Sequence, residues 1–267
     1  MTAAMYVQMS RAEPHHNRPE RPPHPAPDGP SRAIIALWFL AAAMSAGLVL
    51  LGTIISPRQM APAVAPALCL LVAAAVAARA LPGAHPHAGL GPANAVTLLR
   101  AALAALLVAP ILMPGGLAGR DALAWGLTLA TAGALVLDGL DGWLARRSGL
   151  ASPFGARFDM EVDAGLAALL SVLALASGKA GAWVLLLGFM RYGFVAAAMV
   201  WPWLLAPLPG RRGRKTVCVI QIATLTALMA PPVVPPLSGW AVGLALALLV
   251  WSFAVDVLWL RARRVRA

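Results

Sequence analysis

Four aspartates are spaced at helical intervals within DGLDGWLARRSGLASPFGARFDMEVD, the segment that begins at Asp138 and ends at Asp163. Asp138 and Asp141 are three residues apart, and Asp159 and Asp163 are four apart. Residues at these spacings share one face of a helix, so each pair is expected to point in one direction. Like charges at close range cannot all stay ionised without a counter-charge, so four converging carboxylates predict a bound cation. Carboxylate oxygens favour hard divalent ions such as Mg²⁺ or Mn²⁺, and Mg²⁺ commonly bridges to substrate phosphates.

The residues between the two pairs favour phosphate as the ligand. Gly142 and Ala145 remove side-chain bulk beside the acids, so a ligand can approach closely. Arg146 adds a planar guanidinium that suits phosphate. The alternative is a salt-bridged loop in which neighbouring arginines neutralise the aspartates and Gly155 only turns the chain. The combination of positions favours a site for metal and diphosphate over that loop.

The elements that carry this motif belong to a very apolar chain. Hydrophobic residues make up 60% of its 267 residues and charged residues 12%, whereas soluble domains are roughly 45 to 50% apolar. A helix needs about 20 apolar residues to cross the hydrocarbon core of a bilayer. The sequence predicts eight such helices, at Ala33–Ile55, Ala61–Leu81, Asn94–Met113, Ala122–Leu137, Val162–Ala176, Ala182–Leu205, Thr216–Ala230 and Leu237–Leu260.

Because backbone groups cannot stay unpaired in lipid, these windows predict an all-α fold, a polytopic membrane helical bundle of about eight transmembrane helices. The fourth and fifth windows are short because their ends carry the aspartates. We expect the short turn between them to contain Ser152, Pro153 and Gly155.

Basic residues predict which side of the membrane each loop faces. With eight spans both termini lie on one side, and that side collects most of the 21 Lys and Arg residues. The loops on the other side hold only Arg58, Arg120 and Lys179. This asymmetry places both termini and the aspartates in the cytoplasm of a multi-pass protein, in a membrane of the bacterial inner-membrane type. The net charge of +11 therefore mostly reflects the membrane topology, and binding to nucleic acid is not expected.

The chain divides near Leu81, where LPGAHPHAGLGPAN interrupts the apolar sequence before Asn94. We expect three regions: a disordered cytoplasmic tail at residues 1–32, a two-helix transmembrane extension at 33–81, and a six-helix catalytic core at 82–267. The extension is expected to pack against the core or anchor it, because every candidate site lies downstream.

The aspartate segment resembles a family signature. It agrees at every position with the motif DxxDGxxAR, eight residues, GxxxDxxxD of the CDP-alcohol phosphotransferases (CDP-alcohol phosphatidyltransferases), which are integral membrane enzymes. A second match is PNAVTLLR, Pro92 to Arg100, which is similar to the opening of the family's first core helix. The resemblance covers about Gly91 to Arg261, which is the six-span core.

This resemblance implies a reaction in which an alcohol attacks the diphosphate of a CDP-linked substrate and CMP is released. It implies a transferase with two divalent ions, Mg²⁺ or Mn²⁺, that hold the diphosphate, and it makes a homodimer reasonable. Asp163 is the implied general base. The implied metal ligands are Asp138, Asp141, Asp159 and Asp163, and the residues implied to contact the CDP substrate are Asn94, Thr97, Gly142, Arg146 and Ser152.

The acceptor side carries weaker signals. Arg191 falls within a predicted span, where an arginine normally faces the interior of a bundle and has a partner. It is interpreted as part of the acceptor pocket, and a structural pair with Asp256 or with a helix carbonyl is the alternative. Asp256 itself is expected to pair with Arg261 or Arg263. Lys215, in the run GRRGRKT, is expected either to bind a phosphorylated acceptor or to contact lipid headgroups.

We therefore expect a phospholipid biosynthesis enzyme that transfers a phosphatidyl group from CDP-diacylglycerol to a small polar alcohol, with glycerol 3-phosphate as one candidate. The first alternative is an enzyme of the choline or ethanolamine type, which joins a soluble CDP-alcohol to a lipid acceptor. A non-enzymatic membrane scaffold or transporter is the second, although the acids are not spread over broken helices in two matching halves as a transporter would require. The motif predicts binding of the CDP end of the substrate, and it does not indicate which alcohol is involved.

Overall fold

The computed structural model describes residues 31–264, and the regular secondary structure over that range is all helical. Within it, only the backbone is described at Ser31, Asp141, Gly142, Trp143, Ala145, Arg146, Arg212 and Arg264. The helices are α2 (Ser31–Ile55), α3 (Met60–Ala80), α4 (Pro92–Ala105), α5 (Val108–Ile111), α6 (Asp121–Ser148), α7 (Pro153–Ala176), α8 (Leu185–Val200), α9 (Arg212–Met229) and α10 (Leu237–Arg264), with 3-10 turns η1 (Ala182–Val184) and η2 (Pro202–Leu205).

The prediction of a polytopic helical bundle is confirmed. Over the described residues, 6 helical segments are long and apolar enough to cross a membrane: Arg32–Ile55, Met60–Ala80, Pro92–Ile111, Asp121–Leu140, Ala182–Val200 and Leu237–Arg263. Helices α7 and α9 were also predicted as spans, but they carry charged residues along their first turns and fall outside this set. Most of the predicted tail lies outside the described residues, and its last positions, Ser31 and Arg32, already belong to α2.

Several predicted boundaries differ from the structure. Helix α6 continues 11 residues past Leu137, to Ser148, and α7 begins 9 residues before Val162, at Pro153. The third predicted span breaks after Ala105 into α4 and the short α5. The sixth is divided into η1, α8 and η2. The break after α8 falls at Trp201, because the residue before a proline disfavours helical geometry. The predicted turn with Ser152, Pro153 and Gly155 is wrong in part, since the last two lie in the first turn of α7.

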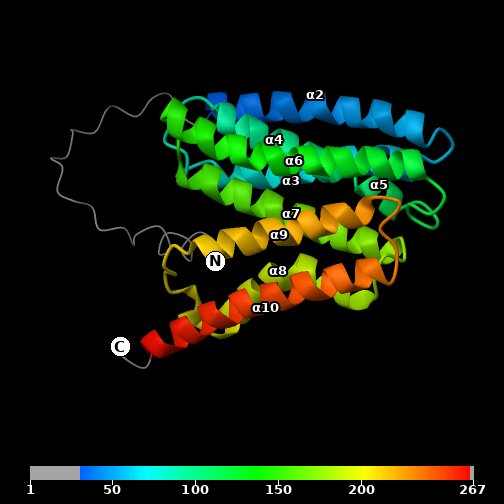
Figure 1. Cartoon of the computed structure of the whole chain (residues 1–267). Helices are drawn as coiled ribbons and strands as arrows, with labels where there is room; N and C mark the ends of the chain where they lie inside the picture. Colours follow the sequence, from blue (N-terminus) through cyan, green and yellow to red (C-terminus); the bar gives the residue numbers. More distant parts are fainter. Residues whose placement is uncertain (1–30, 265–267) are drawn as a thin grey trace.

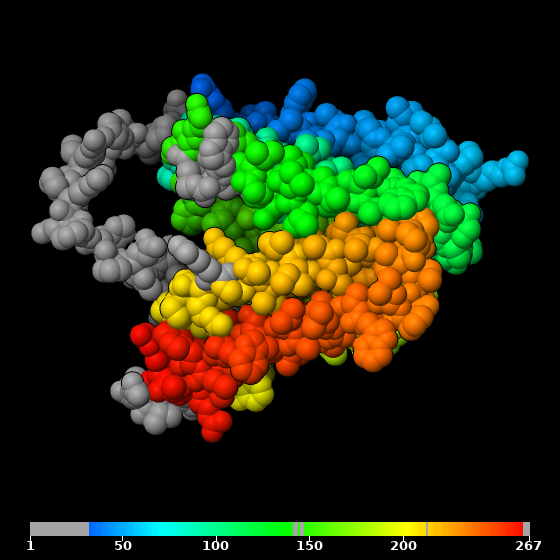
Figure 2. All heavy atoms as spheres, in the orientation of Figure 1, coloured from blue at the N-terminus to red at the C-terminus, as the bar shows by residue number. Residues whose placement is uncertain are grey.

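The helices run roughly along one axis and alternate in direction, so their ends gather at two ends of the bundle (Figure 1). We call one of these the motif end. It holds the α6–α7 turn, the starts of α2, α4 and α9, and the C-terminal turns of α3 and α10. Helices α6 and α9 lie side by side on the face that Figure 2 shows, with α2 and α10 at its two edges. The extension α2–α3 therefore packs on one flank of the core.

Helix α4 joins the extension to the rest of the bundle. It contacts α2 and α3 on one side and α6 and α7 on the other. One buried cluster, which includes Leu37, Leu70 and Leu98, links the extension to α4 and α7. A second, which includes Leu170 and Leu225, fills the space among α4 and α6 to α10. The core and its extension are thus packed as one bundle through α4.

A buried lysine, Lys179, links two connections at the end of the bundle opposite the motif end. The Nζ of Lys179 donates to the carbonyls of Ala230 (3.0 Å), Pro231 (3.3 Å) and Val233 (2.8 Å). These carbonyls belong to the connection between α9 and α10, whereas Lys179 follows α7. The ammonium group therefore ties two connections together and satisfies carbonyls that no helix can use.

Candidate active site

The α6–α7 turn sets the register of the aspartates. Helix α6 ends at Ser148, and the next residue, Gly149, has the left-handed φ of 67° common after a helix. Ser152 then caps α7 by accepting a hydrogen bond from the backbone N–H of Gly155 (3.1 Å). Asp138 lies ten residues before the end of α6, and Asp163 lies ten residues after the start of α7. At 1.5 Å per residue both acids are about 15 Å from the turn, so the two helices bring them to the same depth.

Three of the four predicted metal ligands converge. One carboxylate oxygen from each of Asp138, Asp159 and Asp163 lies within 4.8 Å of the others. Each side chain keeps about a third of its surface exposed, so the cluster faces a space that solvent or a ligand can reach. Asp141 follows Asp138 on α6, and its side chain lies outside the described residues.

Arg100 is placed at the centre of this cluster. Its side chain is 1% exposed, and its guanidinium forms ion pairs with Asp138 (2.9 Å), Asp159 and Asp163. The Nε donates to the Ala134 carbonyl of α6 at 3.1 Å. A buried guanidinium needs such partners, because an unpaired buried charge is costly. Arg100 therefore connects α4 to both aspartate-bearing helices, a role that its sequence position within PNAVTLLR did not show.

Asn94 and Thr97 lie one turn apart on the same face of α4, on the motif-end side of Arg100. Both are buried, at 3% and 2% exposed. The Asn94 amide donates to the Leu90 carbonyl (2.6 Å), and the Thr97 hydroxyl donates to the Ala93 carbonyl (3.1 Å). The Oδ1 of Asn94 lies so near Gly155 that a Cβ there would be 2.8 Å away. Gly155 is thus a point of close approach between α4 and α7.

Two predicted nucleotide contacts, Gly142 and Arg146, are on the last turns of α6. The Arg146 side chain lies outside the described residues. Ser152 is described, at the start of α7 and in the same region as Asn94. Of the predicted nucleotide residues, the structure therefore brings Asn94, Thr97 and Ser152 to the motif end of α4 and α7.

Arg191 of α8 pairs with Glu161, a residue that the sequence analysis did not single out. The Arg191 guanidinium is 2.6 Å from a Glu161 carboxylate oxygen, and both side chains are partly exposed. Glu161 sits between Asp159 and Asp163, two residues from each. Residues two apart do not share a helix face, so the spacing that identified those two acids does not include Glu161. Its only sequence signal is a charge in an apolar helix.

Further cations lie near the cluster at the start of α9. Helix α9 packs against both aspartate-bearing helices, α6 and α7. Its first turns therefore lie at the motif end beside these two helices. Lys215 is exposed on the first turn of α9.

Asp256 has different partners from those expected. It is 6% exposed, and its carboxylate lies 3.2 Å from Arg211 and 3.0 Å from Arg214. The expectation placed its partner on its own helix, at Arg261 or Arg263. The structure instead uses two arginines at the start of α9, so the ion pair fastens α9 to α10.

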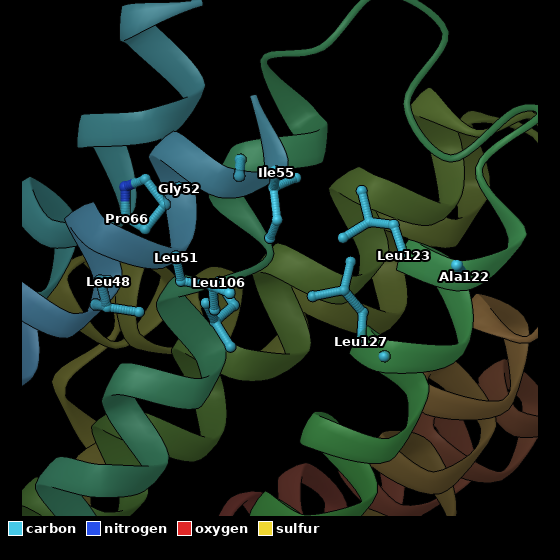
Figure 3. Close-up of a pocket in the computed structure, with 11 residues that line it drawn as sticks. Leu48, Leu51, Gly52, Ile55, Pro66, Leu106, Ala122, Leu123 and Leu127 are labelled. Carbon is cyan, nitrogen blue, oxygen red and sulfur yellow. The ribbon is translucent and has the colours of Figure 1, made fainter. Parts of the chain in front are cut away.

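A separate cavity of about 390 Å³ lies between the extension and the core (Figure 3). Its walls are apolar and come from the last turns of α2, Pro66 of α3, the α4–α5 junction and the first turns of α6, among them Leu51, Ile55, Leu106 and Leu127. Leu127 is eleven residues from Asp138 along α6, about 16 Å at the helical rise. The cavity therefore lies apart from the aspartate cluster.

Comparison with known families agrees with this geometry. Residues 90–251, more than half of the chain, match the CDP-alcohol phosphatidyltransferase family. The chain belongs to this family of membrane transferases, whose members carry out phosphatidyl transfer in phospholipid synthesis. No match was found among curated proteins or among solved structures. The matched residues contain Arg100 and all four aspartates of the motif, and they exclude α2, α3 and most of the segment that follows α3.

Proposed function

We propose that the protein transfers a phosphatidyl group from CDP-diacylglycerol to a small polar alcohol and releases CMP. The observation that carries the proposal is the convergence of Asp138, Asp159 and Asp163 from two helices in a chain of this family. The cluster opens to a partly exposed space in an otherwise apolar bundle, which suits a substrate that has a charged diphosphate and lipid tails.

The donor set fits divalent metal ions. Three carboxylates within 4.8 Å of one another provide the hard oxygen ligands that Mg²⁺ and Mn²⁺ prefer. We assign Asp138, Asp141, Asp159 and Asp163 as the residues that would hold two such ions. When bound, the ions would neutralise charge on the diphosphate and orient it.

Asp163 is the proposed general base. Its carboxylate would take the proton from the acceptor hydroxyl as the hydroxyl oxygen forms a bond to the phosphorus of the phosphatidyl group. The bond from that phosphorus to the oxygen of CMP breaks, and CMP leaves with the electron pair. Support for this assignment is the family motif together with the place of the Asp163 carboxylate in the cluster, where it is partly exposed to the space that a substrate can reach.

The nucleotide is assigned to the motif end of the site. Asn94, Thr97 and Ser152 lie there in the structure, and Gly142 and Arg146 are assigned with them from the motif. A cytidine at the motif end would leave the diphosphate over the aspartates, deeper in the bundle.

The acceptor is assigned to the side of α8 and α9. Arg191, held by Glu161, and Lys215 on the first turn of α9 would bind an anionic group on the alcohol, and glycerol 3-phosphate is the proposed acceptor. Guanidinium and ammonium groups are the usual protein partners of phosphate.

The test is CMP release by the full-length protein in detergent, with Mg²⁺ or Mn²⁺, CDP-diacylglycerol and a panel of alcohols. We expect CMP only when donor, metal and a suitable alcohol are all present. Release with CDP-choline or CDP-ethanolamine plus diacylglycerol, and not with CDP-diacylglycerol, would reverse the assignment of donor and acceptor. No CMP with any pair would refute the enzymatic proposal.

The same assay tests the general base. We expect Asp163→Asn to reduce turnover by at least about 10²-fold, the contribution of a positioned acid or base, and to keep much of the affinity for the CDP-lipid. Asn retains the size of the side chain and loses the proton acceptor. Full activity of Asp163→Asn would show that another group removes the proton.

A further inference from the structure

The segment between α3 and α4 packs against the start of α7. The backbone N–H of Phe154 donates to the Ala84 carbonyl (3.1 Å), and the ring of His85 packs edge-on against Phe154, with centroids 5.7 Å apart. At Gly91, the Cβ of any larger residue would lie 3.2 Å from Leu150. This segment precedes almost all of the matched family residues, and it touches the turn that leads into α7.

His85 is the buried polar group of this segment. It is 7% exposed, and both ring nitrogens have partners. The Nε2 lies 2.9 Å from the Gly89 carbonyl, and the Nδ1 lies 3.0 Å from the Ser152 hydroxyl oxygen. A carbonyl can only accept, so Nε2 carries the hydrogen, and in the neutral ring Nδ1 accepts from Ser152.

A directed chain of hydrogen bonds follows from this tautomer. The Gly155 N–H donates to the Ser152 oxygen (3.1 Å), the Ser152 hydroxyl donates to His85, and His85 donates to Gly89. Ser152 uses its donor and one acceptor site in this way, which holds its side chain in one orientation and leaves a lone pair for a further donor.

The same segment also orients the side chain of Asn94. The carbonyl of Leu90, one residue beyond Gly89, accepts from the Asn94 amide at 2.6 Å. Two side chains assigned to the nucleotide, Ser152 and Asn94, are therefore both oriented by residues 85–90. Neither contact depends on the aspartates.

We propose that His85 is a positioning residue for the cytidine nucleotide, acting through Ser152. The inference rests on the proposed function, because it takes Ser152 as a nucleotide contact. The connection between the extension and the core then helps to shape the substrate site, and it is more than a linker.

The test uses five variants of the full-length protein. His85→Phe keeps a ring against Phe154 and removes both polar nitrogens, and His85→Gln keeps an acceptor and a donor without the ring. His87→Phe is the matched control, because His87 has a 3.4 Å polar contact to the Ala151 carbonyl and phenylalanine keeps the ring that packs edge-on against His85. Ser152→Ala, alone and combined with His85→Phe, completes a double-mutant cycle.

Two quantities are measured in detergent with Mn²⁺: the Kd for CDP by calorimetry, and the KM for CDP-diacylglycerol and for the acceptor alcohol. We expect His85→Phe to weaken CDP binding and raise the KM for CDP-diacylglycerol about three- to tenfold, the loss of one ordinary hydrogen bond. The KM for the alcohol stays unchanged, His85→Gln recovers most of the loss, and His87→Phe behaves as wild type. In the cycle, His85→Phe weakens CDP binding little further once Ser152 is already Ala, because substitutions within one chain of hydrogen bonds do not have additive effects.

The outcomes separate this inference from the proposed function. Wild-type protein that binds CDP and releases no CMP would refute the proposed reaction, and the variants' Kd values would still decide the role of His85. Equal Kd values for wild type and His85→Phe, or losses that multiply in the double variant, would overturn the inference. Absence of CDP binding by the wild type would overturn the nucleotide assignment and this inference together. If His85→Phe does not fold, as judged by thermal unfolding, His85→Leu takes its place.

Discussion

At the scale of single residues, Arg100 determines the charge of the candidate site. Three carboxylates and one guanidinium meet there, so three negative charges and one positive charge leave a net charge of −2 before Asp141 is counted. This net negative charge still attracts a divalent ion. The guanidinium also offsets part of the repulsion among the three acids when no metal is bound.

The first prediction concerns this counter-charge. Arg100→Met should lower the free energy of unfolding in EDTA by about 3 kcal/mol or less, since removing one partner of a fully buried ion pair costs about 3 to 5 kcal/mol and these carboxylates are partly solvated. Mg²⁺ should then raise the melting temperature of the variant more than that of the wild type. Arg79→Met, at an exposed position on α3, is the control. An equal Mg²⁺ shift in Arg100→Met and wild type would contradict the assigned role.

A second prediction concerns Gly155. In Gly155→Ala the new Cβ would lie 2.8 Å from the Asn94 Oδ1, whereas the Cβ of Gly165→Ala in the same helix meets nothing within 4 Å. We expect Gly155→Ala to lose about 1 to 3 kcal/mol of stability, as overpacked sites do, and to bind CDP more weakly. Gly165→Ala should be neutral or slightly stabilising, because alanine favours a helix over glycine. Thermal unfolding and CDP titration of both variants check this, and similar behaviour of the two would refute the close approach.

At the scale of elements, the site depends on how α4, α7 and α8 pack. Helix α4 contributes Arg100 from one side, and α8 contributes Arg191 from another. The contact between α7 and α8 is close at Gly188, where an added Cβ would lie 2.8 Å from the Ala167 carbonyl and nearer still to the Ser171 hydroxyl. A shift of α8 would therefore move Arg191 relative to Glu161.

The third prediction tests this helix crossing. Gly188→Ala should lower the melting temperature and raise the KM for the acceptor alcohol, because α8 must move away from α7. Gly193→Ala, on the same helix with open space around its Cβ, should leave both quantities near the wild-type values. A normal acceptor KM in a destabilised Gly188→Ala protein would show that α8 does not carry the acceptor site.

At the scale of the whole molecule, the even number of long helices places the start of α2 and the end of α10 at the motif end (Figure 1). Most basic residues of the range 31–264 lie at that end, which predicts that it faces the cytoplasm. The orientation can be tested by labelling single cysteines in a background that lacks Cys69 and Cys218. A membrane-impermeant maleimide applied to intact cells should label Gln59→Cys in the α2–α3 turn and should reach Ser148→Cys only after lysis. The reverse pattern would place the motif end outside.

Much of this protein follows from periodicity and composition along the chain. Spacings of three and four residues put Asp138 and Asp141, and likewise Asp159 and Asp163, on helix faces. The apolar windows predicted α2, α3, α9 and α10 to within four residues at each end, whereas α6 and α7 continue well past their windows into the charged motif. These features depend on neighbours within one helix, and such local geometry is the same in any context.

Tertiary packing decided which distant residues meet. Arg100 is 38 residues from Asp138 and 63 from Asp163, and Glu161 is 30 from Arg191. Asp256 pairs with α9 and not with its own helix, and His85 reaches Ser152 from a segment that looked like a linker. Contacts of this kind depend on the rotation and register of whole helices, which the combined packing of many side chains sets. The sequence by itself therefore determined which residues could hold a diphosphate, and only the packed bundle decided which cation balances them and which residues orient the nucleotide side.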